Sequence, residues 1–134
     1  MPHILIADDD AAIRLLWTRV LANAGYRVET VDNGQTAVEM VAAAIPDLLI
    51  TDLMLPGLNG WSVFSRVRTL APRLPILIIS GATTGTPPHG TSLPDHAVFL
   101  RKPVAIGEVL TTVARLLAES PAGRATARGA AVAV

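Results

Sequence analysis

The 134-residue chain contains no cysteine, which excludes a disulfide framework, a cysteine-based zinc site and a thiol nucleophile. Aromatic residues make up only 4% of the chain, and its formal net charge is zero, with 11 Lys and Arg against 11 Asp and Glu. A chain without net charge has no overall field that would hold a nucleic acid or an anionic membrane surface. We therefore expect neither nucleic acid nor a membrane as a partner.

Hydrophobic runs long enough to span a bilayer are also missing, and the first residues lack the basic start of a signal peptide. A cytoplasmic location is the expectation that follows. Hydrophobic residues still make up 51% of the chain and charged residues 16%, which is typical of a folded domain. Because 134 residues are too few for two ordinary domains, the function has to be carried by one hydrophobic core.

Short apolar runs alternate with amphipathic segments along the chain. Apolar runs are typical of buried strands, and strands are predicted at residues 4–7, 26–31, 47–51, 75–79 and 97–100. Helical spacing of apolar residues occurs at residues 11–24, 35–44, 63–70 and 106–119, with Asp10 as the expected N-cap of the first helix and Gly25 as its stop. This alternation predicts right-handed βαβ crossovers and a doubly wound α/β fold with a parallel sheet.

Two segments depart from this pattern. Residues 81–94 contain three glycines and three prolines where the alternation requires a fourth helix, so we expect little or no regular helix there. Residues 120–134 are rich in Ala, Gly and Arg without an apolar stripe, and we expect them to be mobile. The predicted organisation is one domain at residues 1–119 followed by a flexible tail at 120–134.

Polar side chains follow four of the five predicted strands at their carboxyl ends, where open α/β sheets bind ligands. Asp8 and Asp9 follow the first strand, Asp52 the third and Ser80 the fourth, while Lys102, the single lysine of the chain, comes shortly after the fifth. Clustered carboxylates repel one another, so we expect a cation between them, and oxygen ligands favour Mg²⁺.

This set of groups also predicts a reaction. Asp52 would attack phosphorus and form an aspartyl phosphate, while the metal and Lys102 neutralise the phosphoryl oxygens. Ser80 would donate a hydrogen bond to one of those oxygens.

In these motifs the sequence resembles the receiver domains of bacterial two-component response regulators. The matching segments are Ile4-Leu5-Ile6-Ala7-Asp8-Asp9-Asp10, Thr51-Asp52-Leu53-Met54-Leu55-Pro56-Gly57 with Gly60, Ile79-Ser80-Gly81-Ala82 and Phe99-Leu100-Arg101-Lys102-Pro103. The resemblance implies a flavodoxin-like, five-stranded parallel sheet of order 2-1-3-4-5 with helices on both faces. The fourth helix of that fold would here be degraded to a loop.

The resemblance assigns a role to each metal-binding and acceptor residue. Asp52 is the phosphoacceptor, Asp8 and Asp9 form the acidic pair around Mg²⁺, and Met54 offers its backbone carbonyl to the metal.

The resemblance also assigns residues that respond to phosphorylation. The resemblance makes Ser80 the switch hydroxyl, Phe99 the switch aromatic and Lys102 the phosphate-sensing lysine, with a cis bond expected before Pro103. Phe99 is equally well explained by core packing. The expected partners are a histidine kinase or phosphotransfer protein, a downstream protein of unknown identity and, as a further possibility, a second copy in a homodimer.

The expected function is a phosphoacceptor module that signals through protein contacts, with no output domain after residue 119 and no enzymatic activity beyond self-phosphorylation and self-dephosphorylation. A degenerate receiver that binds a partner without phosphorylation is one alternative, motivated by residues 81–94. A phosphatase of the haloacid dehalogenase type is another, motivated by the Asp-x-Asp of Asp8 to Asp10. That family normally continues to Thr or Val where Ala12 stands, and phosphate on Asp8 rather than Asp52 would identify it.

Overall fold

Five parallel strands form the centre of the computed structural model, which describes residues 1–56, 60–81 and 96–119. The sheet has the order β2-β1-β3-β4-β5 and consists of β1 (His3–Ala7), β2 (Arg27–Val31), β3 (Leu48–Thr51), β4 (Ile76–Ser80) and β5 (Ala97–Arg101). All its pairings are parallel. The predicted α/β class, strand order and strand positions are confirmed.

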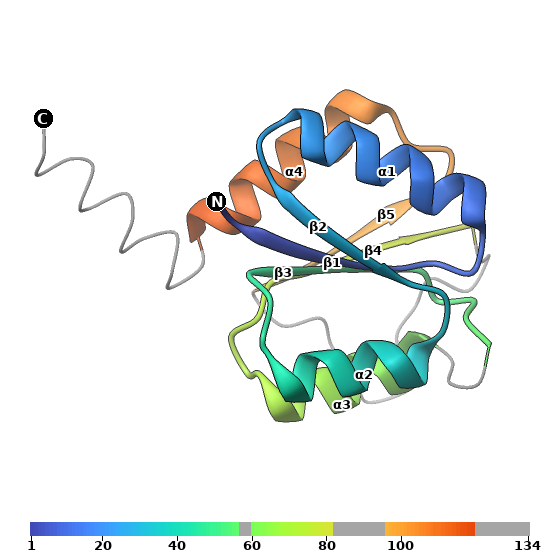
Figure 1. The fold of residues 1–134 in the computed structure, drawn as a ribbon, viewed down its shortest axis with the longest axis vertical. Helices are drawn as coiled ribbons and strands as arrows, with labels where there is room; N and C mark the ends of the chain where they lie inside the picture. Colours follow the sequence, from blue (N-terminus) through green and yellow to red (C-terminus); the bar gives the residue numbers. More distant parts are fainter. Residues whose placement is uncertain (57–59, 82–95, 120–134) are drawn as a thin grey trace, which may run out of the picture.

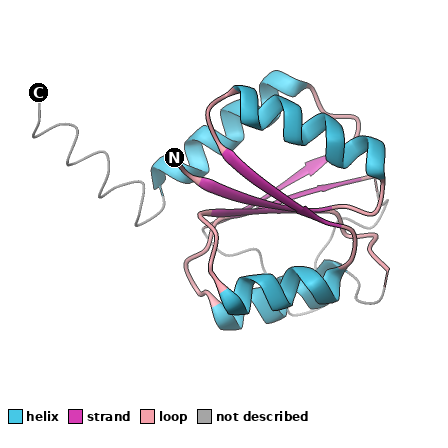
Figure 2. Cartoon of the chain, in the orientation of Figure 1, coloured by secondary structure: helices cyan, strands magenta, loops and turns pink. Residues whose placement is uncertain are grey.

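Helices cover both faces of this sheet (Figure 1). One face carries α1 (Ala11–Asn23) and α4 (Ile106–Glu119), and the other carries α2 (Gly34–Ala43) and α3 (Gly60–Leu70). Figure 2 shows the resulting three layers, with the strands between two helical layers. No helix among the described residues is long and apolar enough to cross a membrane. The predictions for residues 82–94 and 120–134 lie outside the described part of the chain.

Alternation along the strands divides the core into two apolar clusters. Ile4 and Ile6 of β1 belong to the cluster under α1 and α4, whereas Leu5 and Ala7 belong to the cluster under α2 and α3. Residues of a strand point alternately to opposite faces, and both faces are covered here, so the central strands β1, β3 and β4 are almost continuously apolar. The edge strand β2 also carries Arg, Glu and Thr. The sheet is therefore held from both sides, and its carboxyl edge is a rigid support for side chains.

The first helix begins as its sequence predicts. The Asp10 side chain accepts hydrogen bonds from the backbone N–H groups of Ala12, at 2.9 Å, and Ile13, at 3.4 Å. The chain leaves this helix through Gly25, whose positive φ of 99° is a conformation that glycine adopts without strain.

Four residues of the predicted apolar stripes, Leu16, Ala24, Leu70 and Ile106, are exposed instead of buried. Leu16 of α1 is 41% exposed because it lies about 100° around the helix from the buried Trp17, on the flank of the sheet-facing surface. Leu70 is 43% exposed because it is the last residue of α3, and Ala71 and Leu74 are buried after it instead.

Candidate functional site

Asp52 lies at the carboxyl edge of the sheet, directly after the last residue of β3. Its backbone N–H continues the sheet by donating to the carbonyl of Ala7 at 3.1 Å. The residue is only 6% exposed, so its carboxylate is held in a largely buried position. A buried carboxylate needs hydrogen-bond donors or a counter-charge, and the site provides both.

Three groups donate to the Asp52 carboxylate. Oδ1 accepts from the Ser80 hydroxyl at 3.0 Å and from the Met54 backbone N–H at 2.9 Å. Oδ2 accepts from Lys102 Nζ at 2.8 Å. The sequence therefore predicted correctly that Ser80 and Lys102, which are 28 and 50 residues away along the chain, meet Asp52 at this edge.

Lys102 is brought to the site by β5, one residue after the strand ends. Its backbone N–H donates to the Ser80 carbonyl at 3.0 Å, and the predicted cis peptide bond joins it to Pro103. Burial acts to lower the pKa of Lys102, but the hydrogen bond to Asp52 and the charges of Asp52 and Asp8 outweigh it and raise the pKa above its ordinary value. The ammonium is therefore charged throughout the neutral range.

Asp8 is the second buried carboxylate of the site, at 6% exposed. Its Oδ1 accepts from the Asp10 backbone N–H at 2.9 Å, and its Oδ2 lies 3.8 Å from Lys102 Nζ. Burial raises the pKa of Asp8, and the charges of Asp52 and Asp9 raise it further, while the Asp10 N–H and Lys102 oppose the shift. A bound cation would relieve this electrostatic cost.

The predicted group of three carboxylates is only partly assembled. Asp8 and Asp52 share the Lys102 ammonium, whereas Asp9 is exposed. Within the part of the chain that is described, no three His, Cys, Asp or Glu residues are arranged to hold a metal ion. Two carboxylates still suit Mg²⁺, because this ion keeps several water ligands and takes one or two carboxylates from the protein.

Met54 and Phe99 complete the set of predicted site residues. Met54 follows Asp52 by two residues, and its side chain is 66% exposed at the surface. Phe99 of β5 is partly buried and packs against the apolar cluster under α2 and α3. This contact is what core packing predicts for Phe99 and does not test a switching role.

Two further side chains donate hydrogen bonds to backbone carbonyls of the site, and neither residue was predicted from the sequence to be part of it. Arg14 of α1 donates from Nη1 to the carbonyl of Asp8 at 2.7 Å, and Thr51 donates from its hydroxyl to the carbonyl of Asp52 at 3.0 Å. Nothing in the sequence indicates that Arg14 belongs to the site, since arginine is common on helix surfaces. Thr51 could have been identified, because it places a hydroxyl in an otherwise apolar strand.

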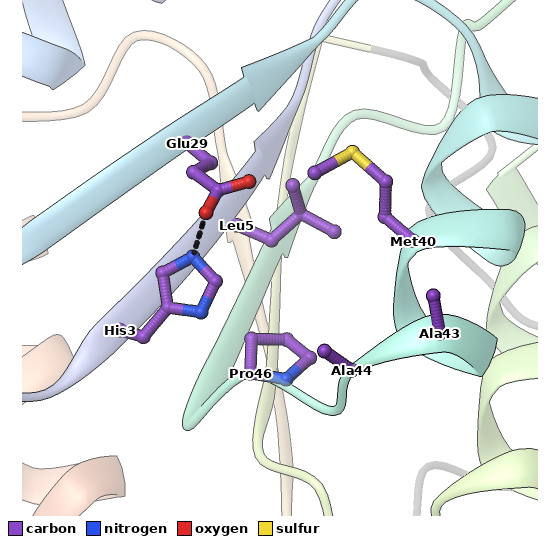
Figure 3. Close-up of a pocket in the computed structure, with 7 residues that line it drawn as sticks. All are labelled: His3, Leu5, Glu29, Met40, Ala43, Ala44 and Pro46. Atoms are coloured by element: carbon purple, nitrogen blue, oxygen red, sulfur yellow. Dashed lines mark ion pairs between the residues drawn. The ribbon is translucent and has the colours of Figure 1, made fainter.

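A small cavity lies at the other end of β1, under α2 (Figure 3). It measures about 150 Å³, and its walls are mostly apolar. At its polar side, His3 Nε2 lies 3.1 Å from Oε1 of Glu29, and the backbone N–H of His3 donates to Asp47 at 2.7 Å. His3 begins β1 and Asp8 follows its end, so this cavity is separate from the carboxylate site.

Comparisons with known proteins agree with this geometry. Residues 4–114 match the response regulator receiver domain family. The DNA-binding transcriptional regulator NtrC of Bradyrhizobium sp. is 35% identical over 116 residues, which are 87% of this chain and 24% of that protein. The response regulator MprA of Mycobacterium leprae is 36% identical over 115 residues, which are 86% of this chain and 50% of that protein.

A solved structure gives the same result over nearly its whole length. The response regulator receiver protein from Sinorhizobium medicae has a TM-score of 0.78 and 32% identity to this chain, covering 88% of this chain and 95% of that one. The chain thus spans about a quarter of NtrC and half of MprA, but almost all of an isolated receiver. From the match over residues 4–114, we conclude that the chain belongs to the response regulator receiver domain family of two-component signalling.

Proposed function

We propose that this receiver domain accepts a phosphoryl group on Asp52 in a Mg²⁺-dependent reaction and that a protein partner reads its phosphorylation state. Receiver domains are signalling modules rather than enzymes in the usual sense. The observation that supports the proposal is the buried Asp52 carboxylate, which is held by Ser80 and Met54 on one oxygen and by the charged Lys102 on the other.

The residues around Asp52 suit a phosphoryl transfer. A carboxylate oxygen of Asp52 would form a bond to phosphorus while the bond between phosphorus and the donor breaks, and the leaving group would keep the bonding electrons. Lys102 Nζ, now 2.8 Å from Oδ2, would pair with the phosphoryl oxygens that carry the negative charge. The Ser80 hydroxyl would turn from Asp52 towards one of these oxygens and so report the phosphorylated state.

The acidic side chains suit the metal that receiver domains use. Asp8 and Asp52 would bind Mg²⁺ directly, with Asp9 and the Met54 carbonyl as further ligands. When bound, Mg²⁺ supplies positive charge that allows an anionic phosphodonor to approach two carboxylates. The raised pKa of Asp8, caused first by burial and opposed by Lys102, supports a cation site at this position.

Partners follow from the family. Receiver domains interact with histidine kinases and phosphotransfer proteins, and we propose a donor of this kind for this chain. The downstream protein, a homodimer and a cytoplasmic location stay predictions, as do the receiver boundaries at residues 1–119 and the switching role of Phe99.

The test is phosphorylation by a small donor. Incubation with acetyl phosphate and Mg²⁺ should add one phosphoryl group to the intact mass, and fragmentation should place it on Asp52. Asp52→Asn should show no addition, because an amide cannot attack phosphorus, and excess chelator should suppress labelling of the unchanged protein. Phosphate on Asp8 would identify the hydrolase alternative, and an unlabelled but folded protein would identify a degenerate receiver.

A further inference from the structure

Thr51 is a polar residue at a fully buried position of an apolar strand. Its exposure is 0%, and its register partners are Ala7 on β1 and Ile78 on β4. Both partners belong to the apolar cluster under α2 and α3. A hydroxyl in such surroundings has lost its hydration, which is costly unless the protein supplies a hydrogen-bond partner. Valine has nearly the same shape without this cost.

The hydrogen-bond partner of Thr51 is the residue that would be phosphorylated. Its Oγ1 donates to the backbone carbonyl of Asp52 at 3.0 Å. The register of β3 with β4 ends at Thr51 and Ile78, so the Asp52 carbonyl lies beyond the last paired residue. On its amino side, Asp52 is fixed by its N–H bond to Ala7. The sheet and the Thr51 hydroxyl therefore fix the Asp52 backbone from both sides.

We propose that Thr51 is a positioning residue that orients the Asp52 carboxylate for phosphoryl transfer, an inference that rests on the proposed function. The Asp52 carbonyl belongs to the peptide group that joins Asp52 to Leu53, one residue before Met54, and the Met54 N–H donates back to Asp52 Oδ1 at 2.9 Å. Fixing that peptide group therefore keeps Oδ1 on Met54 and leaves Oδ2 directed at Lys102. The β-branched Thr51 side chain is stiff at χ1, which keeps its hydroxyl in place.

Two substitutions separate positioning from packing. Thr51→Val keeps the shape and removes the hydroxyl, whereas Thr51→Ser keeps the hydroxyl and removes the methyl group. We expect Thr51→Val to lower the rate of labelling by acetyl phosphate about two- to tenfold, the equivalent of one neutral hydrogen bond, at a melting temperature close to that of the unchanged protein. Thr51→Ser should melt at a lower temperature, because it leaves a small cavity, and should keep the rate.

Thr112 offers a matched control. It is also buried, at 8% exposed, and its hydroxyl donates to a backbone carbonyl, that of Glu108, at 2.8 Å. This bond joins two residues of α4, neither of which donates to or accepts from Asp52. Thr112→Val removes the same kind of hydrogen bond and should leave the rate of labelling unchanged. Equal rate losses in Thr51→Val and Thr112→Val would overturn the proposal.

A second measurement needs no phosphodonor. In amide NMR spectra of the full chain, Thr51→Val should shift the signals of Leu53 and Met54, and Thr51→Ser should leave them near their original positions. Unshifted signals in Thr51→Val overturn the positioning role whatever the labelling result. An unchanged protein that is never labelled contradicts the proposed function instead, so the two failures are distinguishable.

Discussion

Asp8 and Asp52 are equally buried, but they are not equally compensated. Lys102 Nζ lies 2.8 Å from Oδ2 of Asp52 and 3.8 Å from Oδ2 of Asp8. Burial raises the pKa of Asp8, so its ionised form destabilises the folded protein at neutral pH when no cation is bound. Functional sites often reduce stability in this way, because the arrangement that binds a ligand is unfavourable without it.

Asp8→Asn should therefore stabilise the metal-free protein at neutral pH, by about 1 kcal/mol. A raised pKa in the folded state means that the folded protein binds protons more readily than the unfolded chain. The stability of the unchanged protein in chelator should thus increase as the pH falls through the folded-state pKa of Asp8, and this increase should be absent in Asp8→Asn. Urea unfolding at a series of pH values measures both effects.

Adding Mg²⁺ should make the unchanged protein more stable than Asp8→Asn. If Asp8 binds the ion, Mg²⁺ raises the melting temperature of the unchanged protein and has little effect on Asp8→Asn, because only a folded state that binds the ion is stabilised. Equal stabilisation of both proteins would place the metal elsewhere.

Lys102→Ala should slow labelling by acetyl phosphate about a hundredfold, the loss found when a preorganised donor to a developing anion is removed. It should also make the spectra of the phosphorylated and free forms alike, since the phosphoryl group loses its ammonium partner. Because the pKa of Lys102 is raised, its ammonium loses its proton only above the ordinary lysine pKa. Deprotonation of Lys102 should therefore not affect the labelling rate between pH 6 and 9, since this range lies about one unit or more below that ordinary pKa. The exposed neighbour Arg101 supplies the control, because Arg101→Ala removes a positive charge that is not part of the Lys102–Asp52 ion pair.

At the scale of the elements, α1 is connected to the site through its first turn. Asp10 caps α1 through its side chain, and its backbone N–H donates to Asp8 Oδ1 at 2.9 Å. Asn33 caps α2 in the same manner by accepting from the Thr36 N–H at 2.8 Å, but it has no such bond to a site carboxylate. The two caps are therefore comparable in their effect on stability and different in their relation to the site.

Asp10→Ala and Asn33→Ala should each lower the free energy of unfolding by about 1 kcal/mol, which is the usual cost of losing an N-cap. Only Asp10→Ala should also weaken the stabilisation by Mg²⁺, because a frayed first turn no longer holds the Asp10 N–H against Asp8. Thermal unfolding with and without Mg²⁺ measures both effects. A loss of Mg²⁺ response in Asn33→Ala would show that the response follows general stability instead.

The elements were largely predictable because their signals are local. The apolar runs, the Asp10 cap and the Gly25 stop are each visible within a few residues, and the structure contains all of them. The exposure of Leu16 and Leu70 was not predictable, because helical spacing identifies a stripe but not how far the sheet extends beneath it. At the site, residue types and strand ends predicted that Ser80 and Lys102 meet Asp52. The bonds of Thr51 and Arg14 to backbone carbonyls depend on torsion angles that the sequence does not display.

At the scale of the whole molecule, one sheet separates two apolar clusters that share every strand. On β3, Leu48 faces the cluster under α1 and α4, and Leu49 faces the cluster under α2 and α3; both are fully buried. Neither cluster can lose its packing without disturbing the strands that support the other. The carboxyl edge with Asp52 therefore depends on both faces at once.

The two tryptophans make this coupling measurable, because each packs on a different face. Trp17 is buried in the cluster under α1 and α4, and Trp61 packs against the cluster under α2 and α3. Trp61→Phe leaves Trp17 as the reporter, and Trp17→Phe leaves Trp61. In each of these backgrounds the fluorescence transition in urea should coincide with the loss of helical circular dichroism, as expected for a small domain that unfolds in one step.

Adding Leu48→Ala or Leu49→Ala to either background should then lower the free energy of unfolding by about 2 to 5 kcal/mol and move the fluorescence and circular dichroism transitions together. If Leu49→Ala moved the Trp61 transition and left that of Trp17 in place, the two faces would unfold separately, and the acceptor site would rest on one of them alone.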